Sequence, residues 1–312
     1  MKPLFMWAGG KKKMLKKYDP YLPKTFDRYI EPFFGGGAMF IWAYNQNPDA
    51  KFVINDVNEG IISIYREIKN NFDEFEARLI ELSSEYLPLR KEFQPDKKLR
   101  KQLERDWNRD WEELYEHHPC RRYFYFKLRH EHAYKYKDWT KAKEAATLYF
   151  LMKTGFNGIW QVNNNTNRRF GTPFGLGNQT IHVYDHKVLK WWHKALQNTE
   201  ILCGDYEDVV SKWATKDSFV FMDPPYRDSF TQYNTDFHDK EQERVISSLE
   251  HCKKVGALGW LTNRDCGDDF FTSRWDHILY FDVTYTAGRR KKTEDGYQAK
   301  PATEVLLRTK DV

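Results

Sequence analysis

The sequence predicts an α/β protein in which a sheet domain is interrupted by a mostly helical insertion. Two observations support this fold class. Residues 1–72 alternate apolar, strand-like runs with helical patterns, and strand-like runs return after residue 183. Residues 73–182, in contrast, are dominated by polar helical sequence rich in Trp, Tyr, Lys and Arg. We therefore expect residues 1–72 and 183–312 to form the sheet domain and residues 73–182 to form the inserted domain.

The first part of the chain has the order of a βαβ unit. An apolar run at residues 26–33 predicts a strand, and the glycines after it lead into a helix over residues 38–45. A second strand at residues 52–54 ends at Asn55-Asp56, and residues 59–70 carry apolar side chains at helical spacing. This order of strand, glycine turn, helix, strand and acid is typical of a nucleotide-binding sheet.

Further strands are expected in the last third of the chain. Strand-like apolar runs occur at residues 200–203, 219–222, 257–261, 278–283 and 303–307. The run that ends at Met222 is continuous and leads into two prolines, which predicts a buried strand that opens into a loop. In open α/β sheets, ligands bind at such carboxyl ends of strands.

The loop after that strand is Asp223-Pro224-Pro225-Tyr226. It offers an acceptor carboxylate, a carbonyl that Pro225 helps to hold rigid, and an aromatic plane. These groups suit the activation of an amino group conjugated to a heteroaromatic ring, because two acceptors on its hydrogens pull the nitrogen toward a tetrahedral geometry. The alternative is that Asp-Pro-Pro is an ordinary turn.

Three other segments indicate a nucleotide-like cofactor. The glycines Gly35, Gly36 and Gly37 allow close approach of a ligand to the backbone, and Asp56 is placed to accept hydrogen bonds from ribose hydroxyls. The alternative role for Asp56 is to cap the following helix. Asp205 and Tyr206 follow a short strand, where the acid could accept from an adenine amino group while the ring stacks.

Composition limits the class of protein. The net charge of +5 hints at a polyanionic partner, and aromatic residues make up 17% of the chain. The four cysteines have no CxxC spacing, which argues against a zinc site or a disulfide framework and favours a reducing cytoplasm. No apolar run approaches the roughly 18 residues of a membrane span, so we expect no membrane association.

Several motifs in one order resemble the Dam family, the D12 class of adenine-specific DNA N6-methyltransferases with the α motif order. They are residues 5–13, residues 31–37, Asp56, residues 155–175 and residues 223–226. The resemblance implies a Rossmann-like methyltransferase sheet with a helical target-recognition insertion. It also implies S-adenosylmethionine as the methyl donor and no metal.

The resemblance assigns roles to individual residues. Trp7, Ala8, Gly9 and Lys11 would lie along the methionine half of the cofactor, and Glu31, Phe33 and Gly35 to Gly37 would form its cradle. Asp56 would hold the ribose, and Asp205 with Tyr206 the adenine. The target base would be held by Asp223, Pro224, Pro225 and Tyr226.

The DNA side is expected in the insertion and near the C-terminus. Residues 121–143 interleave cations with aromatics, which makes a plausible phosphate-binding surface, although a solvated helical face is the alternative. Residues 154–163 and 170–175 resemble the family's recognition hairpin. The candidate DNA contacts are Arg121, Arg122, Lys127, Arg129, Asn157, Gly158, Gln161, Asn163, Arg168, Arg169, Pro173, Arg289 and Arg290.

The hairpin departs from the usual family pattern at two positions. Gln161 stands where the family commonly has an arginine that reads guanine, and glutamine suits the N6 and N7 atoms of adenine instead. Gly171 replaces the family's usual asparagine. These departures put a GATC target in doubt, although Arg168 and Arg169 could supply guanine contacts.

We therefore expect a site-specific enzyme that methylates N6 of an adenine flipped out of double-stranded DNA, in the cytoplasm of a bacterium or of a phage host. Neither a membrane nor an obligate protein partner is expected. A cytosine-N4 or RNA-adenine methyltransferase is the alternative within the enzyme class. A catalytically silent nucleic-acid-binding protein is the alternative from another class. A restriction partner, an orphan regulator and phage self-protection all remain open as the biological setting.

Overall fold

The computed structural model describes residues 1–7, 10–175, 177, 181–227, 237–285, 291–293, 296–298 and 300–311. The side chains of Lys12, Tyr285 and residues 291–300 lie outside this description. The chain divides into two compact units. The sheet unit comprises Lys2, Ala8–Ile62 and Asn198–Val312, and the helical unit comprises Met1, Pro3–Trp7 and Ser63–Gln197.

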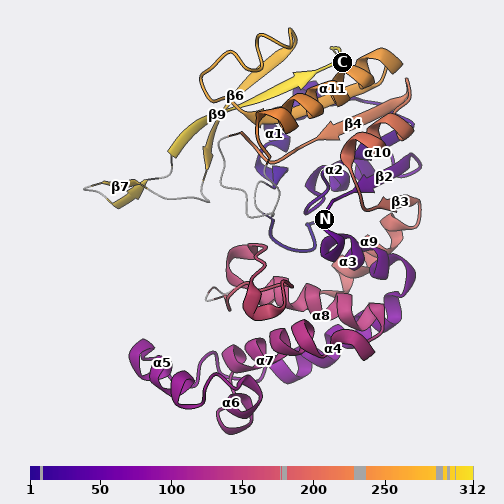
Figure 1. Ribbon diagram of the computed structural model, residues 1–312. Helices are drawn as coiled ribbons and strands as arrows, with labels where there is room; N and C mark the ends of the chain where they lie inside the picture. The colour runs from indigo at the N-terminus through magenta and orange to yellow at the C-terminus, as the bar shows by residue number, and fades with distance from the viewer. Residues whose placement is uncertain are drawn as a thin grey trace. The chain divides into compact units, whose positions relative to one another are not determined.

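The sheet unit contains, among the described residues, a seven-stranded sheet of order β3-β2-β1-β4-β5-β9-β6 (Figure 1). Strands β1 to β5 pair in parallel, and β9 is antiparallel to both β5 and β6. The strands are β1 (Arg28–Glu31), β2 (Lys51–Asn55), β3 (Thr199–Leu202), β4 (Ser218–Met222), β5 (Leu258–Arg264), β6 (Ile278–Tyr285) and β9 (Lys300–Arg308). A separate hairpin pairs β7 (Lys291–Thr293) with β8 (Gly296–Gln298).

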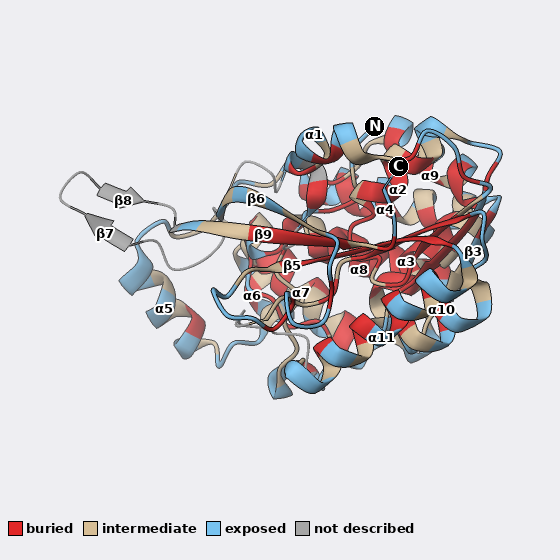
Figure 2. Cartoon of the chain, turned by 90° about the horizontal axis from the view of Figure 1, so that it is seen from above, coloured by how far each residue is buried: buried red, intermediate tan, exposed pale blue. Residues whose placement is uncertain are grey.

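Helices cover both faces of this sheet, as expected for parallel strands joined by crossovers. The helical segments of the sheet unit are η1 (Lys11–Lys13), α1 (Leu15–Tyr18), η2 (Asp19–Tyr21), α2 (Ala38–Gln46), α10 (Tyr206–Trp213) and α11 (Asp239–Val255). Burial is concentrated in the strands and in the helix faces turned toward them (Figure 2).

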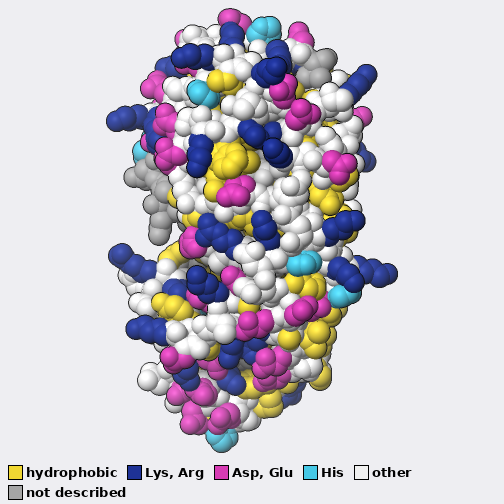
Figure 3. All heavy atoms as spheres, turned by 90° about the vertical axis from the view of Figure 1, so that its right-hand side faces the viewer, with side chains coloured by type: hydrophobic (Ala, Val, Ile, Leu, Met, Phe, Trp, Pro, Cys, Tyr) yellow, Lys and Arg dark blue, Asp and Glu magenta, His cyan; other side chains and the backbone are white. Residues whose placement is uncertain are grey.

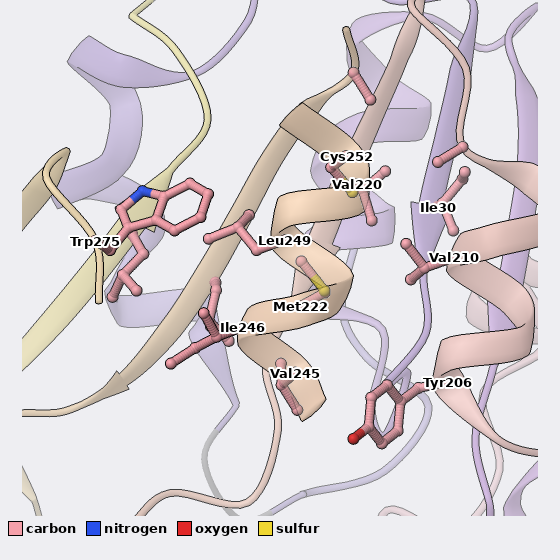
Figure 4. Close-up of a cluster of buried hydrophobic side chains, with 14 of the residues drawn as sticks. Ile30, Tyr206, Val210, Val220, Met222, Val245, Ile246, Leu249, Cys252 and Trp275 are labelled. Carbon is pink, nitrogen blue, oxygen red and sulfur yellow. The ribbon is translucent and has the colours of Figure 1, made fainter. Parts of the chain in front are cut away.

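The alternation of side chains along the central strands divides the core into two parts. One face is mainly aliphatic and packs against α10 and α11 (Figure 4), with Ile30, Val53, Val210, Val220, Val245 and Leu249. The other face is aromatic, with Phe26, Tyr29, Phe40, Phe52, Phe219 and Trp260. The ring centroids of Tyr29 and Phe219 are 5.7 Å apart. Such ring contacts each add about 0.5–1.5 kcal/mol to the free energy of area burial.

The strand order reverses between β1 and β4. From this pair, the chain proceeds outward through β2 and β3 on one side and through β5 on the other. Open α/β sheets bind their ligands outside the carboxyl ends of the strands at such a reversal point, which here are the ends of β1 and β4.

The helical unit is built around α8, which is buried along most of its length. Helices α4 and α7 pack against it. Its segments are the second half of α3 (Glu59–Asn70), α4 (Phe72–Tyr86), α5 (Lys97–Asp106), α6 (Trp111–His117), α7 (Arg121–Tyr134), η3 (Tyr136–Asp138), α8 (Lys141–Thr154), η4 (Phe156–Gly158), η5 (Asn164–Thr166) and α9 (His186–Leu196). A second, small core is formed by Leu114 of α6, Cys120 and Tyr123 of α7, with Leu103 of α5 packed against it.

The α/β fold class expected from the sequence is confirmed. Each expected strand overlaps an observed one, and the helices expected at residues 38–45 and 59–70 correspond to α2 and α3. The assignment of residues 73–182 to target recognition stays a prediction. The helical unit also includes residues 63–70 of α3 and all of α9, which flank that range. These two helices contact each other, with the rings of Tyr65 and Trp192 5.4 Å apart.

In the part of the chain that the structure describes, no helix is long and apolar enough to cross a membrane. Basic and acidic side chains are interspersed over the face drawn in Figure 3.

Candidate active site

Asp223 lies directly after β4, at the reversal point of the sheet. Strand β4 is buried at every residue, and the two prolines that follow cannot donate to a sheet ladder. The Thr262 hydroxyl of β5 donates to Asp223 Oδ1 over 2.7 Å. Lys11 Nζ lies 2.7 Å from the same oxygen. The carboxylate, whose side chain is 19% exposed, is therefore fixed in orientation and still open on one side.

Lys11 is a nearly buried cation, with 5% of its side chain exposed. Besides Asp223, its charge acts on Glu31 and Glu304, two buried acids that come from β1 and β9. Its ammonium also lies 4.7 Å from the centre of the Tyr226 ring. Lys11 thus connects three acids and the aromatic ring of the Asp-Pro-Pro-Tyr loop.

Burial raises the pKa of both Glu31 and Glu304. The Tyr29 hydroxyl donates to Glu31 Oε2 over 2.7 Å, and the Tyr18 hydroxyl donates to Glu304 Oε1. These hydrogen bonds and the charge of Lys11 lower the pKa of each acid, but less than burial raises it. Negative charge at this end of the sheet is therefore costly, and Lys11 offsets it.

Asp56 holds the glycine loop after β1. Its Oδ2 accepts from the Gly35 amide and its Oδ1 from the Asn58 amide, both over 2.9 Å. Gly35 and Gly37 have φ of 48° and 67°, which favours glycine at both positions. The helix-capping alternative for Asp56 is not observed, because Asn58 Oδ1 accepts from the Ile61 amide instead. The Val57 amide also donates to Asp56, so three backbone amides hold a carboxylate that can accept about four hydrogen bonds.

One buried amide ties three loops of the site together. Asn55, at the end of β2, donates through Nδ2 to the carbonyls of Pro32 and Gly204, each over 3.0 Å. Those carbonyls belong to the loops after β1 and β3. The loops after β1, β2 and β3 are therefore fixed to one another next to Asp56.

Three aromatic rings line the same end of the sheet near the start of α10. The Phe33 and Tyr206 ring centroids are 4.7 Å apart, and Phe237 contacts both rings. Asp205 caps α10 through the Glu207 amide and forms an ion pair with Arg244 at 3.0 Å. The structure thus brings a ring pair, a carboxylate and the glycine loop to one edge.

The hairpin segment of the helical unit is held by backbone and side-chain hydrogen bonds within the segment. Gly171 N donates to Gln161 O over 2.7 Å, and Gln161 N donates to Thr172 Oγ1 over 3.2 Å. Asn163 Nδ2 donates to Gly171 O, so this side chain supports the turn. Gly158 has a φ of 62°, and a Cβ there would lie 2.6 Å from Met6 O. Asn157, Arg168 and Pro173 are exposed.

Four of the arginines expected at DNA have partners within the helical unit. Arg121 donates to the carbonyls of Tyr86 and Leu87, and Arg122 pairs with Glu104 at 2.9 Å. Arg129 donates to the carbonyls of Gly171 and Thr172 over 2.9 and 2.8 Å. Arg169 pairs with Glu144 and lies 3.6 Å from the centre of the Tyr136 ring. These contacts give each arginine a role in holding the fold.

Two of the remaining expected residues, Lys127 and Trp7, lie in the helical unit. Lys127 lies 4.9 Å from the centre of the Tyr115 ring, and Trp7, in the helical unit, makes an edge contact with Phe5. Ala8, Gly9, Arg289 and Arg290 lie outside the described residues. No group of three or more His, Cys, Asp or Glu side chains that could hold a metal ion occurs in the described ranges.

Sequence analysis missed Tyr18, Thr262 and Glu304, and it missed Gln242 and Asn263 beneath the loop. A signal was present for some of them. Thr262 and Asn263 are polar residues at the carboxyl end of the otherwise apolar strand β5, and Glu304 interrupts the apolar end of β9. A polar side chain in a buried strand needs a partner, and a functional site can supply one.

Comparison with known proteins identifies a family that this chain matches over most of its length. A family model described as D12 class N6 adenine-specific DNA methyltransferase matches residues 7–287. The type II methyltransferase M.MjaIII of Methanocaldococcus jannaschii is 33% identical over 318 residues, covering 98% of this chain and 98% of that protein. The type II methyltransferase M1.LlaDCHI of Lactococcus lactis subsp. cremoris is 26% identical and covers 84% and 81%. A DNA adenine methylase of Haemophilus influenzae is 25% identical and covers 85% and 80%.

Proposed function

Since this chain belongs to the D12 class of N6 adenine-specific DNA methyltransferases, as the sequence led us to expect, we propose that methyl transfer takes place beside Asp223 at the carboxyl end of β4. The observation that carries this proposal is the fixed position of the Asp223 carboxylate. Thr262 and Lys11 both hold its Oδ1 over 2.7 Å, at the reversal point of the sheet.

The family implies S-adenosylmethionine as the methyl donor, and the residues present fit such a cofactor. We propose that Asp56 accepts hydrogen bonds from the ribose hydroxyls and that Phe33 and Tyr206 pack against the adenine. Gly35 to Gly37 would let the backbone approach the cofactor closely, with Glu31 beside them, while Asp205 would face the adenine end. Trp7, Ala8, Gly9 and Lys11 remain proposed for the methionine half. When bound, the cofactor supplies a methyl group on an already activated sulfonium leaving group.

The work left to this chain is alignment and stabilisation of charge on the target nitrogen. Asp223 and the Pro224 carbonyl would accept the two hydrogens of the adenine amino group. The base must leave the duplex to reach them, and stacking on Tyr226 would offset about 1–3 kcal/mol of that cost. Pro225 restricts the backbone on which this geometry depends.

The substrate is DNA by family, and we propose that it is double-stranded and is read by the helical insertion at residues 73–182. Gln161 would contact an adenine edge, with Arg168, Asn157 and Pro173 exposed nearby in the same hairpin segment. We propose that the enzyme acts on DNA in the cytoplasm of a bacterium or of a phage host.

The test is incubation with methyl-labelled cofactor and duplex or single-stranded DNA, followed by digestion and identification of the labelled nucleoside. The expected product is N6-methyldeoxyadenosine, formed preferentially in the duplex. Asp223→Ala should abolish turnover while cofactor and DNA binding persist. Asp217→Ala, at the amino end of the same strand, is the matched control. Label on cytosine, or substantial turnover by Asp223→Ala, would refute the assignment.

A further inference from the structure

The Asp-Pro-Pro-Tyr loop is anchored by two side chains that reach it from beneath. Because Pro224 and Pro225 have no N–H, the loop cannot be held by amide donation at those residues. Gln242 Nε2 of α11 donates to the Pro225 carbonyl over 2.8 Å. The Arg227 amide donates to Asn263 Oδ1 of β5 over 3.0 Å. The two anchors therefore lie on either side of Tyr226.

The anchors are joined to each other. Asn263 Nδ2 donates to Gln242 Oε1 over 2.8 Å, and Asn263 Oδ1 also accepts from the Arg264 amide over 2.9 Å. These contacts fix the orientation of both amides. Turning Gln242 would place its oxygen against the Pro225 carbonyl, and turning Asn263 would place its NH₂ against two backbone donors.

Both side chains are buried, Gln242 with 1% and Asn263 with 0% of the residue exposed. Gln242 precedes Val245, Ile246 and Leu249 on α11, which belong to the aliphatic core. Burying two amides stabilises a fold only if each is hydrogen-bonded, and an aliphatic pair would fill a core equally well. The presence of two amides here is therefore explained by their hydrogen bonds to the Pro225 carbonyl and the Arg227 amide.

Strand β5 holds both ends of the loop through consecutive residues. Thr262 donates to Asp223 at the start of the loop, and Asn263 accepts from Arg227 at its end. The guanidinium of Arg227 is in turn bound by Asp239 and Asp268 at 2.8 and 2.9 Å. The peptide units around Tyr226 are thus fixed by groups that lie outside the loop.

We propose that Gln242 and Asn263 are positioning residues for methyl transfer: they set the Pro225 peptide and the Tyr226 ring, and through them the Pro224 carbonyl that accepts from the target amino group. This inference rests on the proposed function of residues 223–226. A displacement of about 1 Å at a reacting centre can lower a rate about 100-fold.

The first test replaces Gln242 by Met, which has a similar length but no donor for the Pro225 carbonyl. We expect the single-turnover methylation rate of Gln242→Met to fall about 100-fold, while its Kd for S-adenosylmethionine stays within about threefold of wild type. Ser248→Ala is the matched control, since Ser248 is a buried residue of the same helix whose hydroxyl donates to the Arg244 carbonyl of α11. A folded Gln242→Met enzyme with the wild-type rate would overturn the inference.

The second test measures how the methylation rate depends on pH, which a merely structural role of Gln242 would not change. Gln242→Glu keeps an acceptor for Asn263, but only its protonated form can donate to the Pro225 carbonyl. Its rate relative to wild type should therefore rise as the pH falls. A ratio that does not change with pH would overturn the inference. If wild type itself fails to methylate adenine, the proposed function fails; if wild type is active and both variants match it, only the positioning role fails.

Discussion

Replacing Lys11 by Met would show how the charges of the active site are balanced. The Lys11 ammonium lies 2.7 Å from Asp223 Oδ1, and both side chains are largely buried. At an effective dielectric constant of about 20, a pair at this separation attracts by about 6 kcal/mol. Desolvation opposes that attraction, so breaking a buried pair costs about 3–5 kcal/mol. Lys11→Met should lower the free energy of unfolding of the sheet unit by this amount.

A double-mutant cycle isolates the pair. In an Asp223→Asn background, Lys11→Met no longer leaves that carboxylate without its cation, so the loss should shrink to below about 2 kcal/mol. Part of the loss remains because Glu31 and Glu304 also face Lys11. Urea unfolding followed by tryptophan fluorescence measures all four proteins. Additive effects of the two substitutions would refute the argument, since they would mean that the charges of Lys11 and Asp223 do not interact.

Three further predictions follow from the structure. Asp56→Ala should raise the Kd for S-adenosylmethionine about 100-fold, because it removes charge-assisted hydrogen bonds worth about 1.5–3 kcal/mol each. Calorimetry measures the Kd, and Asp208→Ala, at an exposed aspartate, is the control. An unchanged Kd would exclude a contact between Asp56 and the ribose. Burial, with the charge of Arg169, lowers the pKa of His132 to about 3. The stability that depends on neutral His132 is therefore fully present above pH 6.5 and should be lost as the pH falls toward 3, by up to about 1.4 kcal/mol per pH unit. Urea unfolding should show a steeper fall of the free energy of unfolding with pH in wild type than in His132→Gln, and equal slopes in the two proteins would contradict the prediction. Lys97, Lys98 and Lys101 of α5 lie in the insertion that we propose reads DNA, are exposed, and form no ion pair among the described residues. If α5 contacts phosphates, replacing all three by Gln should reduce the slope of log K for DNA binding against log salt by up to about 2.7. Lys24, Lys216 and Lys254, which precede β1, β4 and β5, give the control triple, and equal slopes in both triples would contradict phosphate contacts by α5.

The fold was predictable because its strands are local and strongly patterned. Runs such as residues 218–222 are apolar throughout, and a parallel strand buried on both faces requires this. The glycine turn and Asp56 were predictable for a related reason. A ligand at the end of a strand needs a backbone that approaches closely and an acid on the next strand, and both leave a mark in the local sequence.

The partners of the site were not predictable, because they come from distant parts of the chain. Nothing near Lys11 in sequence indicates that Asp223, Glu31 and Glu304 surround it. Gln242 lies on a helix whose polar and apolar residues fit an ordinary amphipathic pattern, so its buried position depends on where the loop after β4 passes.

The arginines of α7 show why composition predicts a surface poorly. Arg122, Phe126 and Arg129 recur at helical spacing and share one face, on which both guanidinium groups stack against the Phe126 ring. Arg129 also supports the carbonyls of the hairpin segment. A cation count for residues 121–143 does not separate these arginines from exposed lysines such as Lys137.

The consecutive prolines of the loop after β4 have a spectroscopic consequence. Two of its four residues carry no amide hydrogen, so backbone amide exchange reports on this loop only at Asp223 and Tyr226. The side-chain NH₂ groups of Gln242 and Asn263 provide additional exchange probes beside the loop, since each is buried and donates a hydrogen bond. Their nitrogen–proton signals should exchange slowly with solvent, and they offer a direct view of the loop as cofactor and DNA bind.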